Sequence, residues 1–161
     1  MLRSFCFIAL LFLFSCKTTS YYIVRHAEKE TATMSGDVAL SAEGKQRAED
    51  LKDLLQNKTV KAIYSTNYIR TKSTAQPLAD AKNITIQTYD PRDTGFISRI
   101  KNINTGNVLI VGHSNTVDDL ANQFMGTVVV PGDLPETQYG DLFIVKKKGK
   151  KYSFVKEHFG K

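Results

Sequence analysis

Apolar residues follow two patterns along the chain, short runs typical of strands and the spacing typical of amphipathic helices. Short runs rich in apolar, β-branched and aromatic residues predict strands, and they cover residues 21–24, 60–64, 84–89 and 108–111. The last of these runs is apolar throughout, which is typical of a strand that is covered on both faces. Between the runs, apolar residues recur at helical spacing and predict helices over 42–56, 67–81, 96–103 and 117–125.

The helix after the fourth strand has the clearest pattern. Its apolar residues are spaced for one helical face: Val117, Leu120, Ala121, Phe124 and Met125. Asn115 is a suitable N-cap, and Gly126 can end the helix. Residues 127–138 contain two prolines and predict a loop, and the tail predicts a hairpin that turns at 148–150.

Strands that alternate with helices predict an α/β fold, a three-layer sandwich with a mostly parallel central sheet and the C-terminal hairpin. Ligands of such sheets bind beyond the carboxyl ends of the strands. Arg25 and His26 follow the first strand, and His113 follows the fourth. Arg70 belongs to the first turn of the helix after the second strand. We therefore expect these four side chains at one rim of the sheet.

Two guanidiniums beside two imidazoles are suited to binding an oxyanion. Arginine presents a planar fork that matches phosphate oxygens. Nearby positive charge opposes protonation of an imidazole, and a neutral imidazole is a good nucleophile. Attack on phosphorus would give a phosphohistidine that water then cleaves. This chemistry requires no metal and no other cofactor, and two histidines without a third ligand are weak grounds for a zinc site.

The motifs around these residues resemble those of the histidine phosphatase superfamily, the phosphoglycerate-mutase-like proteins. The resemblance extends from residue 21 to about residue 159. Four segments carry it in order: Val24-Arg25-His26-Ala27-Glu28, Leu40-Ser41-Ala42-Glu43-Gly44, residues 64–75 with Ser65, Arg70, Thr74 and Ala75, and Val111-Gly112-His113. These segments correspond to the family's Arg-His-Gly signature, its Leu-Thr-x-x-Gly helix start, its Ser-x-x-x-Arg-x-x-x-Thr-Ala segment and its second-histidine strand end.

The resemblance implies that His26 is the nucleophile and that Arg25, Arg70 and His113 bind the phosphoryl group. Ala27 replaces the usual glycine, and Ser114 stands where the acid-phosphatase branch has a proton-donating aspartate.

The proton donor is therefore left open among three acids. Asp90 and Asp93 follow the third strand, where the mutase branch has its donor glutamate, and Asp93 is equally well explained as a helix N-cap. Glu28 is the third candidate, with a surface ion pair to Lys29 as its alternative. Without an acid, good leaving groups such as phosphohistidine or acyl phosphate would be favoured.

The first residues have the features of an export signal. Arg3 precedes an apolar run, Ser4–Ser15, that is shorter than the roughly 20 residues of a transmembrane helix. The run ends at Cys16 in a sequence that resembles a bacterial lipobox. We therefore expect a signal peptide over 1–15, a lipidated N-terminus and short linker over 16–20, and the phosphatase domain over 21–161. An uncleaved signal anchor is the alternative.

This N-terminus predicts a lipid-anchored protein of the bacterial cell envelope that faces the periplasm. The net charge of +6 is concentrated in residues 146–151, which contain five lysines. These lysines fit a solvated hairpin tip, or contact with anionic lipid headgroups or anionic substrates. Nucleic acid is a poor partner, because the lysines are not interleaved with aromatic residues.

The sequence thus favours a membrane-anchored phosphatase that acts on a phosphomonoester or a related phosphoryl group, in a small molecule or a phosphoprotein. A mutase is disfavoured, because the chain has little room for insertions that would enclose a sugar phosphate. The alternative from another class is a non-catalytic lipoprotein of the envelope that binds a phosphorylated ligand in the same pocket.

Overall fold

The computed structural model describes residues 17–31, 36–103 and 106–160. The strands are β1 (Thr18–Arg25), β2 (Val60–Ser65), β3 (Ile86–Thr88), β4 (Asn107–Gly112), β5 (Asp141–Lys148) and β6 (Lys151–His158). The helices are α1 (Ala42–Leu55), α2 (Ile69–Lys82), α3 (Phe96–Lys101) and α4 (Val117–Met125). The predicted signal peptide and the lipidation site at Cys16 lie outside the described residues.

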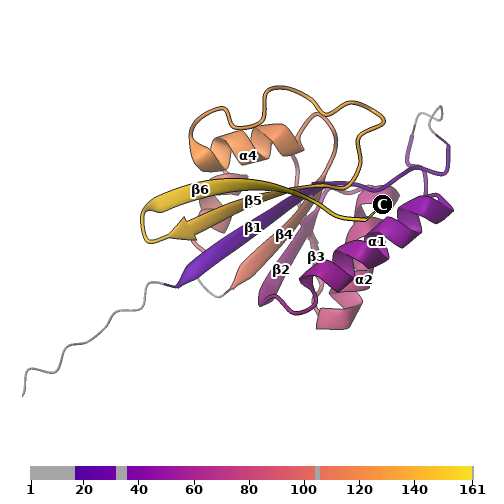
Figure 1. Cartoon of the computed structure of the whole chain (residues 1–161), viewed down its shortest axis with the longest axis horizontal. Helices are drawn as coiled ribbons and strands as arrows, with labels where there is room; N and C mark the ends of the chain where they lie inside the picture. The colour runs from indigo at the N-terminus through magenta and orange to yellow at the C-terminus, as the bar shows by residue number, and fades with distance from the viewer. Residues whose placement is uncertain (1–16, 32–35, 104–105, 161) are drawn as a thin grey trace, which may run out of the picture.

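The strands form one six-stranded sheet in the order β3-β2-β4-β1-β5-β6. The first four strands of this order run parallel, β5 is antiparallel to β1, and β6 pairs antiparallel with β5. The predicted fold class, a mostly parallel sheet with a C-terminal hairpin, is confirmed. Because the strands run parallel, the carboxyl ends of β1, β2 and β4 meet at one edge (Figure 1).

The two faces of the sheet pack against different helices. Alternate residues of β1 point to opposite faces, so Tyr21 and Ile23 join one core with residues of α3 and α4. Tyr22 and Val24 join the other core with residues of α1 and α2. Figure 1 shows α4 on one side of the sheet and α1 and α2 on the other. The three predicted layers follow from this arrangement.

Several element boundaries differ from the predictions. β1 begins at Thr18, so residues 18–20 are not linker, because they pair with Lys146–Lys148 of β5. α2 begins at Ile69, two residues later than predicted, and continues through Pro77 to Lys82. The N-cap of α4 is Thr116 and not Asn115. Gly126 ends α4 as predicted, in the left-handed conformation that glycine adopts easily.

No helix within the described residues is long and apolar enough to cross a membrane.

Candidate active site

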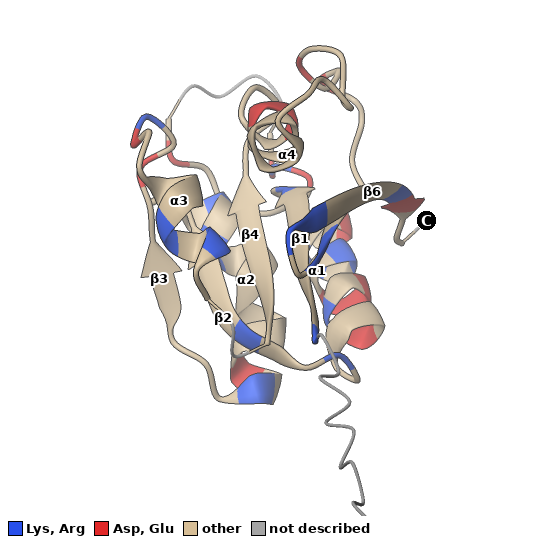
Figure 2. Ribbon diagram, turned by 90° about the vertical axis from the view of Figure 1, so that its left-hand side faces the viewer, with Lys and Arg blue, Asp and Glu red and all other residues tan. Residues whose placement is uncertain are grey.

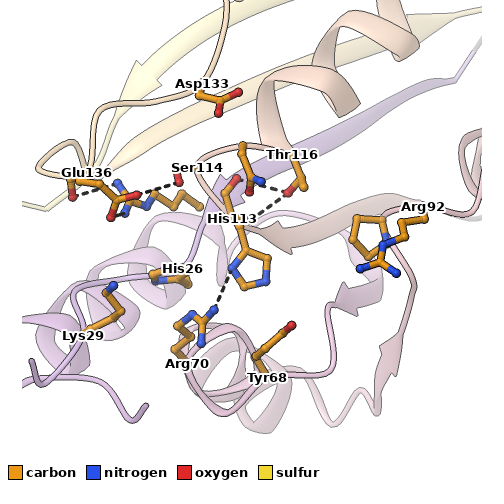
Figure 3. A pocket seen from close by; sticks show the side chains of 13 residues that line it. His26, Lys29, Tyr68, Arg70, Arg92, His113, Ser114, Thr116, Asp133 and Glu136 are labelled. Atoms are coloured by element: carbon orange, nitrogen blue, oxygen red, sulfur yellow. Dashed lines mark hydrogen bonds and ion pairs between the residues drawn. The ribbon is translucent and has the colours of Figure 1, made fainter. Parts of the chain in front are cut away.

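The ends of β1 and β4 bring the two histidines together. Arg25 pairs with Gly112 in the parallel ladder, and the His26 N–H donates to the Gly112 carbonyl at 2.9 Å. The two imidazole rings lie edge to face with their centroids 5.4 Å apart. The next residue is fixed to α2, because the Ala27 N–H donates to Thr74 Oγ1 at 2.9 Å. Figure 3 shows both histidines at the resulting pocket.

The side chain of His26 is held as a neutral imidazole with one free nitrogen. The residue is only 4% exposed, and its Nδ1 lies 2.7 Å from the Ala27 carbonyl oxygen. A carbonyl can only accept, so Nδ1 carries the hydrogen and Nε2 keeps its lone pair. Burial above all, together with the charges of Arg25 and Arg70, lowers the pKa of His26 to about 3. Nε2 is therefore available as a nucleophile at neutral pH.

A chain of hydroxyl groups orients His113. Its Nε2 lies 2.9 Å from Thr66 Oγ1, which donates to Thr71 Oγ1. Its Nδ1 lies 3.4 Å from a guanidinium nitrogen of Arg70, which can only donate. The consistent tautomer therefore has the hydrogen on Nε2 and an accepting Nδ1. Burial, then Arg70 and Arg25, lower the pKa of His113 to about 4.

Arg70 reaches across the pocket from the first turn of α2. It donates to the Gly36 carbonyl at 3.0 Å, and its guanidinium lies 4.5 Å from the ring centre of Tyr68. The Tyr68 ring also meets His113 edge to face at 4.9 Å, although the residue is 42% exposed. Tyr68 therefore fixes the relative position of the second arginine and the second histidine.

Arg25 is buried and held by the loop before β5. One of its nitrogens donates to the carbonyls of Pro135, Glu136 and Gln138, at 2.8, 3.1 and 3.0 Å. The other lies 3.0 Å from the Glu136 carboxylate, and the guanidinium lies 4.2 Å from the ring centre of Tyr139. Its buried Nε has no hydrogen-bond partner among the described residues, as is true of Arg70 Nε. These unpaired donors add positive potential at the pocket.

The segment Leu40–Gly44 positions the loop that follows His26. The Ser41 N–H donates to the Glu28 carbonyl at 3.0 Å, and the Ser41 side chain caps α1 by accepting from the Gly44 N–H. A Cβ at position 44 would lie 2.2 Å from the Glu28 carbonyl oxygen, so only glycine fits there. The start of α1, which carries part of the family resemblance, thus holds the loop after His26 in place.

The pocket is a cavity of about 650 Å³ that contains all four predicted side chains. Arg25, His26, Arg70 and His113 come from three different elements and meet as expected from the strand ends. Lys29, Tyr68 and Arg92 also line it, and Figure 3 shows Arg92 on the side of Tyr68. Among the described residues, no group of three or more histidine, cysteine, aspartate or glutamate side chains could hold a metal ion.

None of the three predicted proton donors lines this cavity. Glu28 pairs with Arg47 at 2.7 Å and lines a separate cavity. Asp93 pairs with Arg99, which lowers the pKa of its carboxyl, and it accepts from the Gly95 N–H just before α3. Asp90 accepts from the Arg92 N–H at 2.9 Å and lines neighbouring cavities.

The acids that do line the cavity are Asp133 and Glu136, which the sequence analysis did not consider. Both belong to residues 127–138, for which the sequence predicted a loop but no role in the site. The Glu136 carboxylate lies 3.0 Å from Arg25 and 3.3 Å from Ser114 Oγ, and Figure 3 shows it beside Ser114. The Leu134 N–H donates to the Ser114 carbonyl, which fixes this part of the loop against the end of β4.

A sequence profile of known proteins agrees with the local geometry. The profile of the histidine phosphatase superfamily (branch 1) matches residues 21–92, which include Arg25, His26 and Arg70. The chain is therefore similar to this superfamily over somewhat less than half of its length. No curated protein matches the sequence significantly.

Solved structures with low sequence identity share the fold of this chain. Alpha-ribazole phosphatase from Shigella flexneri is 16% identical, with a TM-score of 0.67 over 85% of this chain and 95% of that one. YhfR from Bacillus stearothermophilus is 21% identical, with a TM-score of 0.67 over 86% and 96%. A protein from Agrobacterium tumefaciens assigned as the phosphohistidine phosphatase SixA is 22% identical, with a TM-score of 0.60 over 89% and 98%.

The two histidines also predict how stability depends on pH. In the folded state their pKa values are about 3 and about 4, below the ordinary value of about 6.5. As the pH falls below about 6.5, the unfolded chain therefore takes up protons that the folded chain does not. The free energy of unfolding should fall by up to about 1.4 kcal/mol per pH unit for each histidine.

Urea titrations between pH 7 and about 4 measure this dependence. The double variant His26→Gln/His113→Gln should lose less stability than the wild type over this window. Carboxyl groups contribute equally to both proteins, so only the difference between the two slopes is informative. Identical slopes would mean that the histidines are as easily protonated in the folded chain as in the unfolded one.

Proposed function

We propose that this protein is a phosphatase that hydrolyses a phosphomonoester or a related phosphoryl group through a phosphohistidine on His26. One observation carries the proposal above all others. A buried imidazole with a free Nε2 lies beside Arg25, Arg70 and His113, in a cavity open enough to admit a phosphoryl group. A protein that only binds phosphate needs the cations but gains nothing from a neutral imidazole with a free lone pair.

The reaction has two displacements at phosphorus. In the first, Nε2 of His26 forms a bond to phosphorus while the bond from phosphorus to the leaving oxygen breaks, and an acid gives that oxygen a proton. In the second, a water oxygen forms a bond to phosphorus while the bond from phosphorus to Nε2 of His26 breaks. The water's proton passes to the residue that gave a proton in the first step, and phosphate leaves. The arginines neutralise charge on the phosphoryl oxygens in both steps.

His113 changes its protonation state with the occupancy of the pocket. In the structure its Nδ1 accepts a long contact of 3.4 Å from Arg70. A bound phosphate dianion would offset the arginine charges that, after burial, hold its pKa low. Nδ1 can then take up a proton and donate to a phosphoryl oxygen. The Thr66 hydroxyl keeps the ring in place, because Nε2–H is a donor in both states.

We infer that Glu136 is the proton donor. Its carboxylate lies between Arg25 and Ser114, the residue that directly follows His113. A phosphate dianion bound to Arg25 would place two negative groups side by side, and a proton on Glu136 relieves that repulsion. The side chain is 74% exposed, so it can take this proton from solvent. Neither Asp90 nor Asp93 has comparable access to the pocket.

The effect of removing the Glu136 carboxylate on kcat should depend on how much the leaving group needs a proton. We expect Glu136→Gln to lower kcat about 10²-fold for an alkyl phosphate, whose leaving oxygen must be protonated. For p-nitrophenyl phosphate, which releases a stable anion, kcat should change less than about 3-fold. The measurement is kcat for both substrates, with Asp133→Asn and the exposed Glu157→Gln as matched variants. An equal loss with both substrates would show that Glu136 only positions Arg25.

The cavity sets the substrate class broadly. Lys29 and Arg92 add positive charge at its rim, which suits a substrate with more negative charge than one phosphoryl group. Small phosphorylated molecules and phosphoproteins both fit this description. The names of two solved relatives, an alpha-ribazole phosphatase and a protein assigned as a phosphohistidine phosphatase, make these substrates reasonable first assays.

Trapping the intermediate tests the proposal. Residues 17–161, which contain every described helix and strand, would be mixed with labelled p-nitrophenyl phosphate or phosphohistidine and quenched. The wild type should retain label in an acid-labile, base-stable form, and His26→Asn should retain none. A wild type that binds phosphate but neither turns over nor retains label would favour the non-catalytic envelope lipoprotein instead.

A further inference from the structure

The first described residues of the chain lie beside the tip of the C-terminal hairpin. Thr18 pairs with Lys148 at the end of β5, and Lys148 pairs in turn with Lys151 at the start of β6. Gly149 and Lys150 form the turn between them. Figure 1 shows the turn and the start of β1 at the same end of the molecule. Lys17, the first described residue, therefore lies at this tip.

Five lysines gather at this end, and we call them the lysine tip: Lys17, Lys146, Lys148, Lys150 and Lys151. All five are exposed, and none makes an ion pair within the described part of the chain. Figure 2 shows lysine and arginine in blue near the start of β1 and on β6. The lysine tip is thus a compact positive surface with no internal counter-charge.

The arrangement of these lysines is unfavourable for the isolated domain. Lys148 and Lys151 are direct cross-strand partners, and like charges opposite each other destabilise a hairpin. Lysines often protect an edge strand from pairing with other chains, which accounts for Lys151 on β6. That explanation does not cover Lys146 and Lys148, because β5 lies inside the sheet between β1 and β6. An external anion would relieve the repulsion.

We propose that the lysine tip docks on an anionic membrane surface. The chain itself supplies the reason for choosing lipid: the apolar run Ser4–Ser15 and the expected lipid on Cys16 directly precede Lys17. An anchor at that point holds the lysine tip at the headgroups, where several positive charges add to the attachment made by the acyl chains. Lipid phosphate and carboxylate groups then supply the missing counter-charge.

Binding to vesicles tests this surface apart from the lipid anchor. Residues 17–161 contain every described element and both large cores, so this fragment carries the fold without the apolar segment. Its partition onto phosphatidylcholine vesicles would be measured by sedimentation, with and without phosphatidylserine. The wild type should prefer the vesicles that contain phosphatidylserine. Each lysine at the surface should contribute about 5-fold to the partition coefficient.

The matched variants remove the same charge from opposite ends of the sheet. Lys148→Gln/Lys150→Gln should lower the partition coefficient about 25-fold. Lys45→Gln/Lys72→Gln changes the exposed Lys45 and the half-buried Lys72, near the starts of α1 and α2, and should lower it less than about 2-fold. Thermal unfolding of each protein checks that the fold is intact. Equal losses in the two variants, no preference for phosphatidylserine, or tighter binding to single-stranded RNA would overturn the proposal.

Discussion

Replacing His26 with asparagine should lower kcat/KM for p-nitrophenyl phosphate by about 10⁴-fold or more. Asparagine is similar in size and polarity, so it can occupy the buried site while it lacks a nucleophilic nitrogen. The side chains proposed to bind phosphate, Arg25, Arg70 and His113, remain in the variant. Binding of inorganic phosphate, measured by calorimetry, should therefore change far less than the rate.

The matched control for this variant is His158→Asn. His158 is the third histidine of the chain, lies on β6, and its side chain is 56% exposed beside Asp141. It does not line the cavity, so kcat/KM should stay within about 2-fold of the wild type. If His26→Asn kept the wild-type rate, the nucleophile would be another residue and the proposed intermediate would be wrong.

Replacing Arg70 with lysine should lower kcat/KM by about 10²- to 10³-fold. The guanidinium contacts the Gly36 carbonyl, reaches His113 Nδ1 and lies over the Tyr68 ring at the same time. Lysine keeps the positive charge, but its single ammonium group cannot make these three contacts together. The loss should appear in both kcat and the affinity for inorganic phosphate, because in the proposed mechanism the fork contacts the phosphoryl group in the bound state and in the transition state.

Arg99→Lys is the matched control for Arg70→Lys. Arg99 is exposed, pairs with Asp93 and lies outside the cavity, so its replacement should leave kcat/KM unchanged. A partial rescue of an Arg70→Ala variant by added guanidinium, but not by added ammonium, would support the role of the fork. Wild-type activity in Arg70→Lys would mean that charge alone is sufficient at this position.

The parts of the fold that local patterns determine were predictable from sequence. In a strand such as Val108–Val111 the apolar side chains point to both faces, so both faces must be buried, and this indicated a central strand. Parallel strands then place their carboxyl ends at one edge, which brought Arg25, His26 and His113 together before any coordinates were known. The helical spacing of the segment after β4 similarly predicted α4, including its end at Gly126.

The surroundings of the site depend on contacts that no local pattern contains. Glu136 meets Arg25 from more than a hundred residues away, through a loop without periodicity. For Glu28 the sequence suggested only an ion pair with its neighbour Lys29, whereas α1 brings Arg47 to its carboxylate. Asp90 and Asp93 were placed by alignment to a family motif, and their side chains instead serve the turn before α3. The position of a loop in the fold depends on tertiary packing, which the spacing of residues in the sequence does not reveal.

The length of β1 determines which molecules can reach the pocket. Its eight residues run from the lysine tip at Thr18 to the site at Arg25, and an extended chain rises about 3.3 Å per residue, so roughly 25 Å separate the two ends. A domain that stands on a membrane by its lysine tip would hold the pocket at this height, facing the aqueous compartment. The headgroups of the same membrane would then be out of reach, and the substrates would arrive from solution.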